Sequence, residues 1–150
     1  MIFPSTMRFP VAPGLRAALA ALLMSLCAPL SAAGGEAAAW AQGLRHISAE
    51  DGLTLLRISH DLFPDSPRDD AAFRACIDGF DRAAADPDER AAIDDAMSMV
   101  LGASRRMGYM SYVEIADEYE RPRLARMLAD GRWMRGFRQG MQECLARRDG

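Results

Sequence analysis

Few side chains in this sequence have both the type and the spacing that catalysis or metal binding requires. The two histidines, His46 and His60, lie on different segments, whereas a metal site needs three or four converging ligands. His60 directly precedes Asp61, so these two residues could form a ligand pair or an acid–base pair. We favour the simpler interpretation of a histidine near a helix C-terminus, where the helix dipole stabilises a cation.

Acidic clusters at 69–70, 86–89 and 94–95 fit helix starts or solvated faces. They lack the loop spacing that calcium binding needs. The sequence also contains no C-x-x-C, H-E-x-x-H, P-loop or G-x-G-x-x-G motif. We therefore predict no catalytic, metal-binding or cofactor-binding residue in this chain.

All 18 basic residues are arginine, and 21 acids give a formal net charge of −3. This balance argues against a nucleic-acid-binding protein, which normally carries a basic face. Arg121, Arg123 and Arg126 could form a patch for an anionic ligand. A solvated face that pairs with Glu118 and Glu120 is the preferred interpretation.

The N-terminus has the three-part organisation of a secretory signal peptide. Arg8 and Arg16 precede an uncharged apolar run over residues 17–28, and small residues follow Pro29. Cleavage is expected after Ala33, with Ala41 as the second candidate, and the alternative is an uncleaved anchor. No twin-arginine pair precedes the run, so we expect the general secretory route to the periplasm or outside. We expect no stable membrane span after cleavage.

Removal of residues 1–33 leaves two cysteines, Cys76 and Cys144. An even pair in an oxidising compartment is a natural disulfide candidate. Cys76 falls in the apolar stripe of one expected helix and Cys144 on the apolar face of the last one. If those helices pack together the two residues form a disulfide; the alternative is a pair of buried free thiols.

The remaining chain is expected to be all-α: a flexible leader over 34–47, then a helical domain over 48–150 with five or six short helices. Ser48 resembles a helix cap, and residues 64–67 end the first helix. A second helix begins near Asp69 or Asp70. Its apolar positions recur at helical spacing: Phe73, Cys76, Ile77, Phe80 and Ala84.

Asp86 followed by Pro87 indicates the start of a third helix. A loop around Gly108, a short helix over 111–119 and a helix after Pro122 are expected next. The last helix carries apolar residues four apart from Trp133 to Leu145. Its glycines, Gly136 and Gly140, either weaken the helix or permit close helix approach.

The order of these features resembles the gluconate 2-dehydrogenase subunit 3 family, the small subunit of flavin-dependent sugar and alcohol dehydrogenases. The resemblance covers residues 48–140. It is carried by LTLLRISHDLFP over 53–64, AAADP over 83–87, Glu120-Arg121 ahead of Leu124, and GRWMRGFR over 131–138. Trp133-Met134 stand where the family usually has two aromatic residues.

The resemblance implies a non-catalytic periplasmic subunit that accompanies a large FAD-carrying dehydrogenase and often a cytochrome c subunit. Such subunits assist assembly, stability or export. The family commonly carries a twin-arginine signal, and its lack here argues for assembly or stability over export. Trp133 and Met134 are our candidate partner-interface residues. The alternative is a free-standing secreted helical binding protein with no flavoprotein partner; an enzyme that acts alone has little support.

Overall fold

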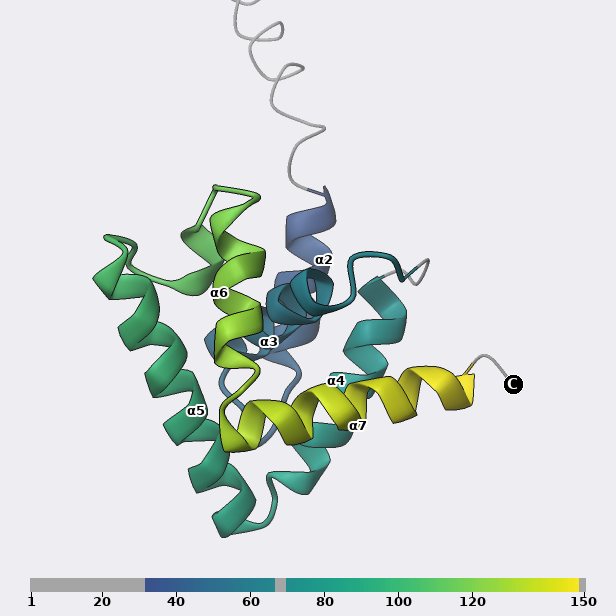
Figure 1. The fold of residues 1–150 in the computed structure, drawn as a ribbon. Helices are drawn as coiled ribbons and strands as arrows, with labels where there is room; N and C mark the ends of the chain where they lie inside the picture. The colour runs from purple at the N-terminus through teal and green to yellow at the C-terminus, as the bar shows by residue number, and fades with distance from the viewer. Residues whose placement is uncertain (1–31, 67–69, 149–150) are drawn as a thin grey trace, which may run out of the picture. The chain divides into compact units, whose positions relative to one another are not determined.

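The computed structural model describes residues 32–66 and 70–148. The expected signal peptide falls almost wholly on residues 1–31, which lie outside this part. The elements are α2 (Ala32–Gln42), α3 (Ala49–Leu62), α4 (Asp70–Ala83), α5 (Pro87–Arg106), the 3₁₀ turn η1 (Tyr112–Glu114), α6 (Glu120–Leu128) and α7 (Arg132–Arg148) (Figure 1). With six α-helices and no strand in the described residues, the expected all-α fold is confirmed. None of these helices has the length and apolar character needed to cross a membrane.

Helix α3 is the centre of the packing, because it contacts α4, α6, α7 and η1. The side chain of Ser48 caps it by accepting a hydrogen bond from the backbone N–H of Asp51, as the sequence predicts. Leu55 and Ile58 are completely buried. Burial of apolar side chains on this scale is the main favourable term that holds a small helical domain together.

Helices α4 and α5 follow their sequence signals closely. Phe73, Cys76 and Ile77 of the predicted stripe on α4 are buried in the core. The side chain of Asp86 accepts hydrogen bonds from the N–H groups of Asp88 and Glu89 at the start of α5. Both helices begin where a capping residue or an acid meets the positive end of the helix dipole.

Residues 34–47 were expected to be a flexible leader, but most of them belong to helix α2. The indole N–H of Trp40 donates a 2.9 Å hydrogen bond to Asp78 of α4. Ala41 is buried, and Leu44 packs against the core. Composition did not reveal this helix, because an alanine-rich segment carries almost no apolar periodicity.

Asp81 of α4 holds the turn that follows α2. Its carboxylate accepts hydrogen bonds from the backbone N–H groups of Arg45, His46 and Ile47, at 2.8–3.2 Å. Burial by itself raises the pKa of Asp81, but these donors outweigh that effect and leave the pKa below its ordinary value. The carboxylate therefore stays ionised and fixes the turn on α4.

A buried polar network joins α3, η1 and α6. Arg121 Nε donates to Asp61 Oδ2 at 2.8 Å, and the hydroxyl of Tyr112 lies 2.8 Å from the same oxygen. Arg121 Nη1 also donates to the carbonyl of Ile115 at 3.0 Å. The preferred interpretation of Arg121 as part of a solvated face is therefore wrong: its charge is neutralised inside the protein.

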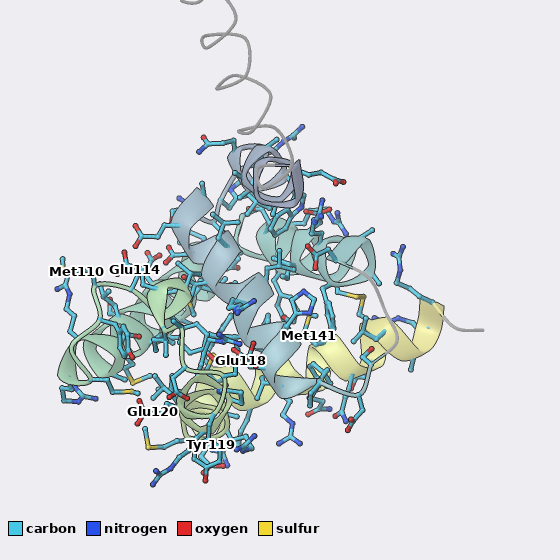
Figure 2. The ribbon with its side chains drawn as sticks, turned by 90° about the horizontal axis from the view of Figure 1, so that it is seen from above. Met110, Glu114, Glu118, Tyr119, Glu120 and Met141 are labelled. Carbon is cyan, nitrogen blue, oxygen red and sulfur yellow. A yellow bond between two sulfur atoms is a disulfide. The ribbon has the colours of Figure 1, made fainter. Side chains whose placement is uncertain are left out.

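The segment between α5 and α6 is less helical than expected. Gly108 has a φ of +90°, a conformation that favours glycine and ends α5 with a left-handed turn. The short helix expected over 111–119 is a single 3₁₀ turn, η1. Tyr112 and Ile115 are buried and anchor this segment to the core. Figure 2 shows Glu118, Tyr119 and Glu120 gathered outside the start of α6, whereas Met141 lies between the helices.

Candidate partner-binding groove

Helix α7 is fixed on α4 by the predicted disulfide, which the structure confirms. Cys76 of α4 and Cys144 of α7 are bonded, and their Cα atoms lie 5.9 Å apart. Cys76 is buried, whereas Cys144 is only partly buried. Helix α7 also contacts both α4 and α5, and its start lies beside α5 (Figure 1).

The two glycines of α7 have different roles. A Cβ atom on Gly140 would lie 2.8 Å from the ring of Phe80, so this glycine permits α4 and α7 to approach closely. A Cβ atom on Gly136 would meet nothing within 4 Å. Of the two explanations that the sequence left open, close approach therefore applies to Gly140. Gly136 has open space in front of it.

These environments predict opposite effects of alanine. Gly140→Ala is expected to lower the free energy of unfolding by about 1–2 kcal/mol, because overpacking displaces Phe80. Gly136→Ala is expected to raise it by about 0.5–1 kcal/mol through helix propensity alone. Gly102→Ala on α5 is the control for propensity, since its Cβ would make only an ordinary contact with Arg106. Chemical denaturation checks all three variants; equal effects at positions 136 and 140 would contradict this assignment.

The space in front of Gly136 is an open groove of about 740 Å³ between α5 and α7, with the end of α4 as its third wall. Its floor is aromatic: the rings of Trp133 and Phe137 are stacked with centroids 5.4 Å apart, and Phe80 lies 4.9 Å from Phe137. Met99 of α5 also lines the groove and is 53% exposed. An exposed apolar groove of this kind is typical of a protein-binding site.

The two candidate interface residues lie in different environments. Trp133 is half-buried and lines the groove. Met134 is only 1% exposed and belongs to the hydrophobic core, so a partner could not contact it directly. Neighbours in a helix point about 100° apart, which is why adjacent residues have such different surroundings. Of the predicted pair, Trp133 alone remains an interface candidate.

Charged groups of both signs line the groove. Glu89 and Asp95 come from the α5 side and Arg132 from the α7 side. A partner segment with one apolar side chain over the aromatic floor could place polar groups beside these charges. This division into an apolar centre and a polar rim is the usual composition of a protein–protein interface.

The histidines and their acidic neighbours, which the sequence offered as possible ligands or acid–base groups, do not come together in one site. His60 Nε2 lies 2.6 Å from Asp70 Oδ1, and its ring packs edge-on against Phe73. Its sequence neighbour Asp61 instead belongs to the network of Arg121. His46 is on the turn after α2, where Arg90 Nη2 lies 3.0 Å from its Nδ1. No group of His, Cys, Asp and Glu in the described part of the chain could hold a metal ion.

Sequence reasoning missed a concentration of exposed apolar side chains. Among the described residues, all six exposed large apolar side chains lie between positions 99 and 127: Met99, Met107, Met110, Val113, Tyr119 and Met127. Met127 of α6 is 62% exposed. The signal that could have shown this is the excess of methionine after position 96, because methionine is common at adaptable binding surfaces.

Comparisons with models of protein families, with curated proteins and with solved structures found no match.

Proposed function

We propose that this chain is a non-catalytic periplasmic subunit that binds a FAD-dependent sugar or alcohol dehydrogenase and assists its assembly or stability. The observation that carries the proposal is the open groove between α5 and α7. Its Trp133 belongs to the 131–138 segment on which the family resemblance rests. In this proposal FAD and the substrate belong to the partner, and this chain supplies a rigid contact surface.

The disulfide supports the proposed location. Structural disulfides form and persist in oxidising compartments such as the periplasm and are rare in the cytosol. The bond between Cys76 and Cys144 joins positions 68 residues apart. It therefore constrains most of the helical domain and would keep the groove in shape before a partner arrives.

The packing of α2 favours one of the two expected cleavage sites. Cleavage after Ala41 would remove Trp40, with its hydrogen bond to Asp78, together with the buried Ala41 itself. Cleavage after Ala33 would keep both. We therefore expect the mature protein to begin at Gly34, which intact-mass spectrometry of the exported protein can check. A mature chain that begins at Gln42 would show that α2 is dispensable.

The proposal is tested by purifying the tagged protein from the periplasm of its own host and measuring the flavin and dehydrogenase activity that accompany it. Wild-type protein should bring down a flavoprotein that oxidises a sugar or alcohol. Gly136→Leu should reduce the recovered flavin at least tenfold, because the new side chain fills the groove. The variant should be at least as stable as wild type, because a Cβ at this position meets no atom of the described residues within 4 Å and leucine favours a helix more than glycine does.

Gln139→Leu is the matched control, because it adds the same side chain to an exposed position of α7 that does not line the groove. It should leave the recovered flavin unchanged. Equal recovery with Gly136→Leu and wild type would refute the groove as the contact site. If the purified wild-type protein carried no flavoprotein with it, the proposed function would be refuted and the alternative of a free-standing binding protein would be favoured.

A further inference from the structure

A second concave site lies away from the groove, between the start of α3, the middle of α5 and the segment before η1. It is a pocket of about 340 Å³. Three carboxylates line it, those of Glu50, Asp51 and Asp94, and no basic side chain of the described residues does. The pocket is therefore strongly negative at neutral pH, and a cation in it would be attracted from several sides.

The polar groups of this pocket are largely unpaired. Asp51 interacts with Ser48, its helix-capping partner, but none of the three carboxylates has an ion pair within the described part of the chain. Thr54 also lines the pocket and is only 7% exposed. Its hydroxyl has no hydrogen-bond partner among the described residues. Because solvent can still reach this hydroxyl through the pocket, a ligand or a water molecule there can complete its hydrogen bonds.

The wall of the pocket continues into an exposed apolar segment. Ser111 lines the pocket, and the residue before it, Met110, is 69% exposed. Val113 is exposed as well. Glu114 accepts a hydrogen bond from the backbone N–H of Met110, and Figure 2 shows these two residues together. The segment 107–120 carries four acids and no basic residue.

We propose that this pocket binds an arginine side chain of a partner protein, while Met110 and Val113 contact apolar side chains next to that arginine. A guanidinium carries five donors in a planar array and suits a site with several carboxylates and hydroxyls better than an ammonium does. Arginine is also, with tryptophan and tyrosine, one of the residue types that most often dominate the binding energy of protein interfaces. The inference holds whether or not the partner is a flavoprotein.

The charge of the site excludes two other occupants. An anionic lipid surface would be repelled by the carboxylates of the pocket and of the 107–120 segment. A metal ion would need converging ligands, and no such group occurs in the described residues. The acidic pocket and its methionine-bearing rim are therefore complementary to a basic, partly apolar protein segment.

The probe is a fluorescein-labelled helical peptide with arginine and leucine on one face, compared with a twin in which citrulline replaces arginine. Fluorescence anisotropy should show binding of the arginine peptide and at least tenfold weaker binding of the citrulline twin. Glu50→Gln with Asp94→Asn should weaken binding of the arginine peptide roughly tenfold. Met110→Ser should weaken both peptides by a similar factor, because it removes the apolar contact.

The control variant is Asp65→Asn with Asp130→Asn, which changes the net charge equally at exposed positions outside the pocket. It should change the affinity less than twofold. An equal loss of affinity in this control would show general charge attraction and overturn the proposal, as would equal binding of the citrulline twin. Thermal unfolding of each variant distinguishes lost binding from lost folding. Neither result depends on the flavoprotein experiment, so the two proposals can fail separately.

Discussion

Removal of the disulfide by Cys76→Ala with Cys144→Ala is expected to lower the free energy of unfolding by about 4 kcal/mol. The bond closes a loop of 68 positions, and in the chain-entropy model a loop of this length restricts the unfolded chain by roughly that amount. A domain of this size has a total stability of about 5–15 kcal/mol. The melting temperature should therefore fall by roughly 15 °C.

Thermal unfolding with and without a thiol reductant provides the measurement. Wild-type protein under reducing conditions should become about as unstable as the double variant, while the variant itself should not respond to the reductant. Gln142→Ala, at an exposed position of α7 close to the bond but outside it, is the control and should change the stability by less than about 0.5 kcal/mol. Two titratable thiols in wild-type protein from the periplasm would contradict the prediction.

The sequence predicted best those features that depend on neighbouring residues. The start of α5 was predictable because a capping Asp86 and Pro87 act within one turn. The buried face of α4 was predictable from the helical spacing of Phe73, Cys76 and Ile77. The disulfide was predictable because both cysteines lie on apolar helix faces. A small bundle offers each apolar face few partners, so two such faces often pack against each other and bring their cysteines together.

The features that the sequence did not predict depend on contacts between distant segments. Asp81 binds a turn more than 30 positions earlier in the chain, and nothing in its own neighbourhood distinguishes it from a surface acid. The arginines at 121, 123 and 126 look alike in the sequence, yet only Arg121 is buried. Hydrophobic periodicity predicts which face of a helix is buried, but not which polar group finds a buried partner.

The sequence predicted one residue of the candidate groove, Trp133, but not the groove itself, which depends on contacts between distant segments. Trp133 and Met134 were both chosen from the family resemblance of segment 131–138, although the two residues have different environments. The groove lies between α5 and α7, and Gly136 has no side chain that could fill it. Such a space depends on the angle between two helices, which side-chain packing of the whole bundle determines.

The second large effect is expected at the buried ion pair between α3 and α6. Arg121→Met should lower the free energy of unfolding by about 3–5 kcal/mol, because it leaves the carboxylate of Asp61 buried without its counter-ion. Arg121 and Asp61 are only 8% and 5% exposed at their side chains, so water cannot easily replace the lost partner. Tyr112 would still donate to Asp61, but one neutral hydroxyl does not compensate a full charge. Burial first, and then this hydrogen bond, raise the pKa of Tyr112 well above its usual range, so it stays protonated.

The test is a double-mutant cycle measured by chemical denaturation. Asp61→Leu with Arg121→Met removes both charges and should cost less than Arg121→Met alone, because no unpaired charge remains. Its remaining cost comes from the carbonyl of Ile115, which loses the donor that Arg121 supplies. Arg123→Met, on the exposed side of the same helix, is the control and should change the stability by less than about 0.5 kcal/mol. The result that would contradict this is additivity. If the loss of unfolding free energy in the double variant equalled the sum of the losses in Asp61→Leu and Arg121→Met, the two residues would be energetically independent, and the buried pair would not hold α6 on α3.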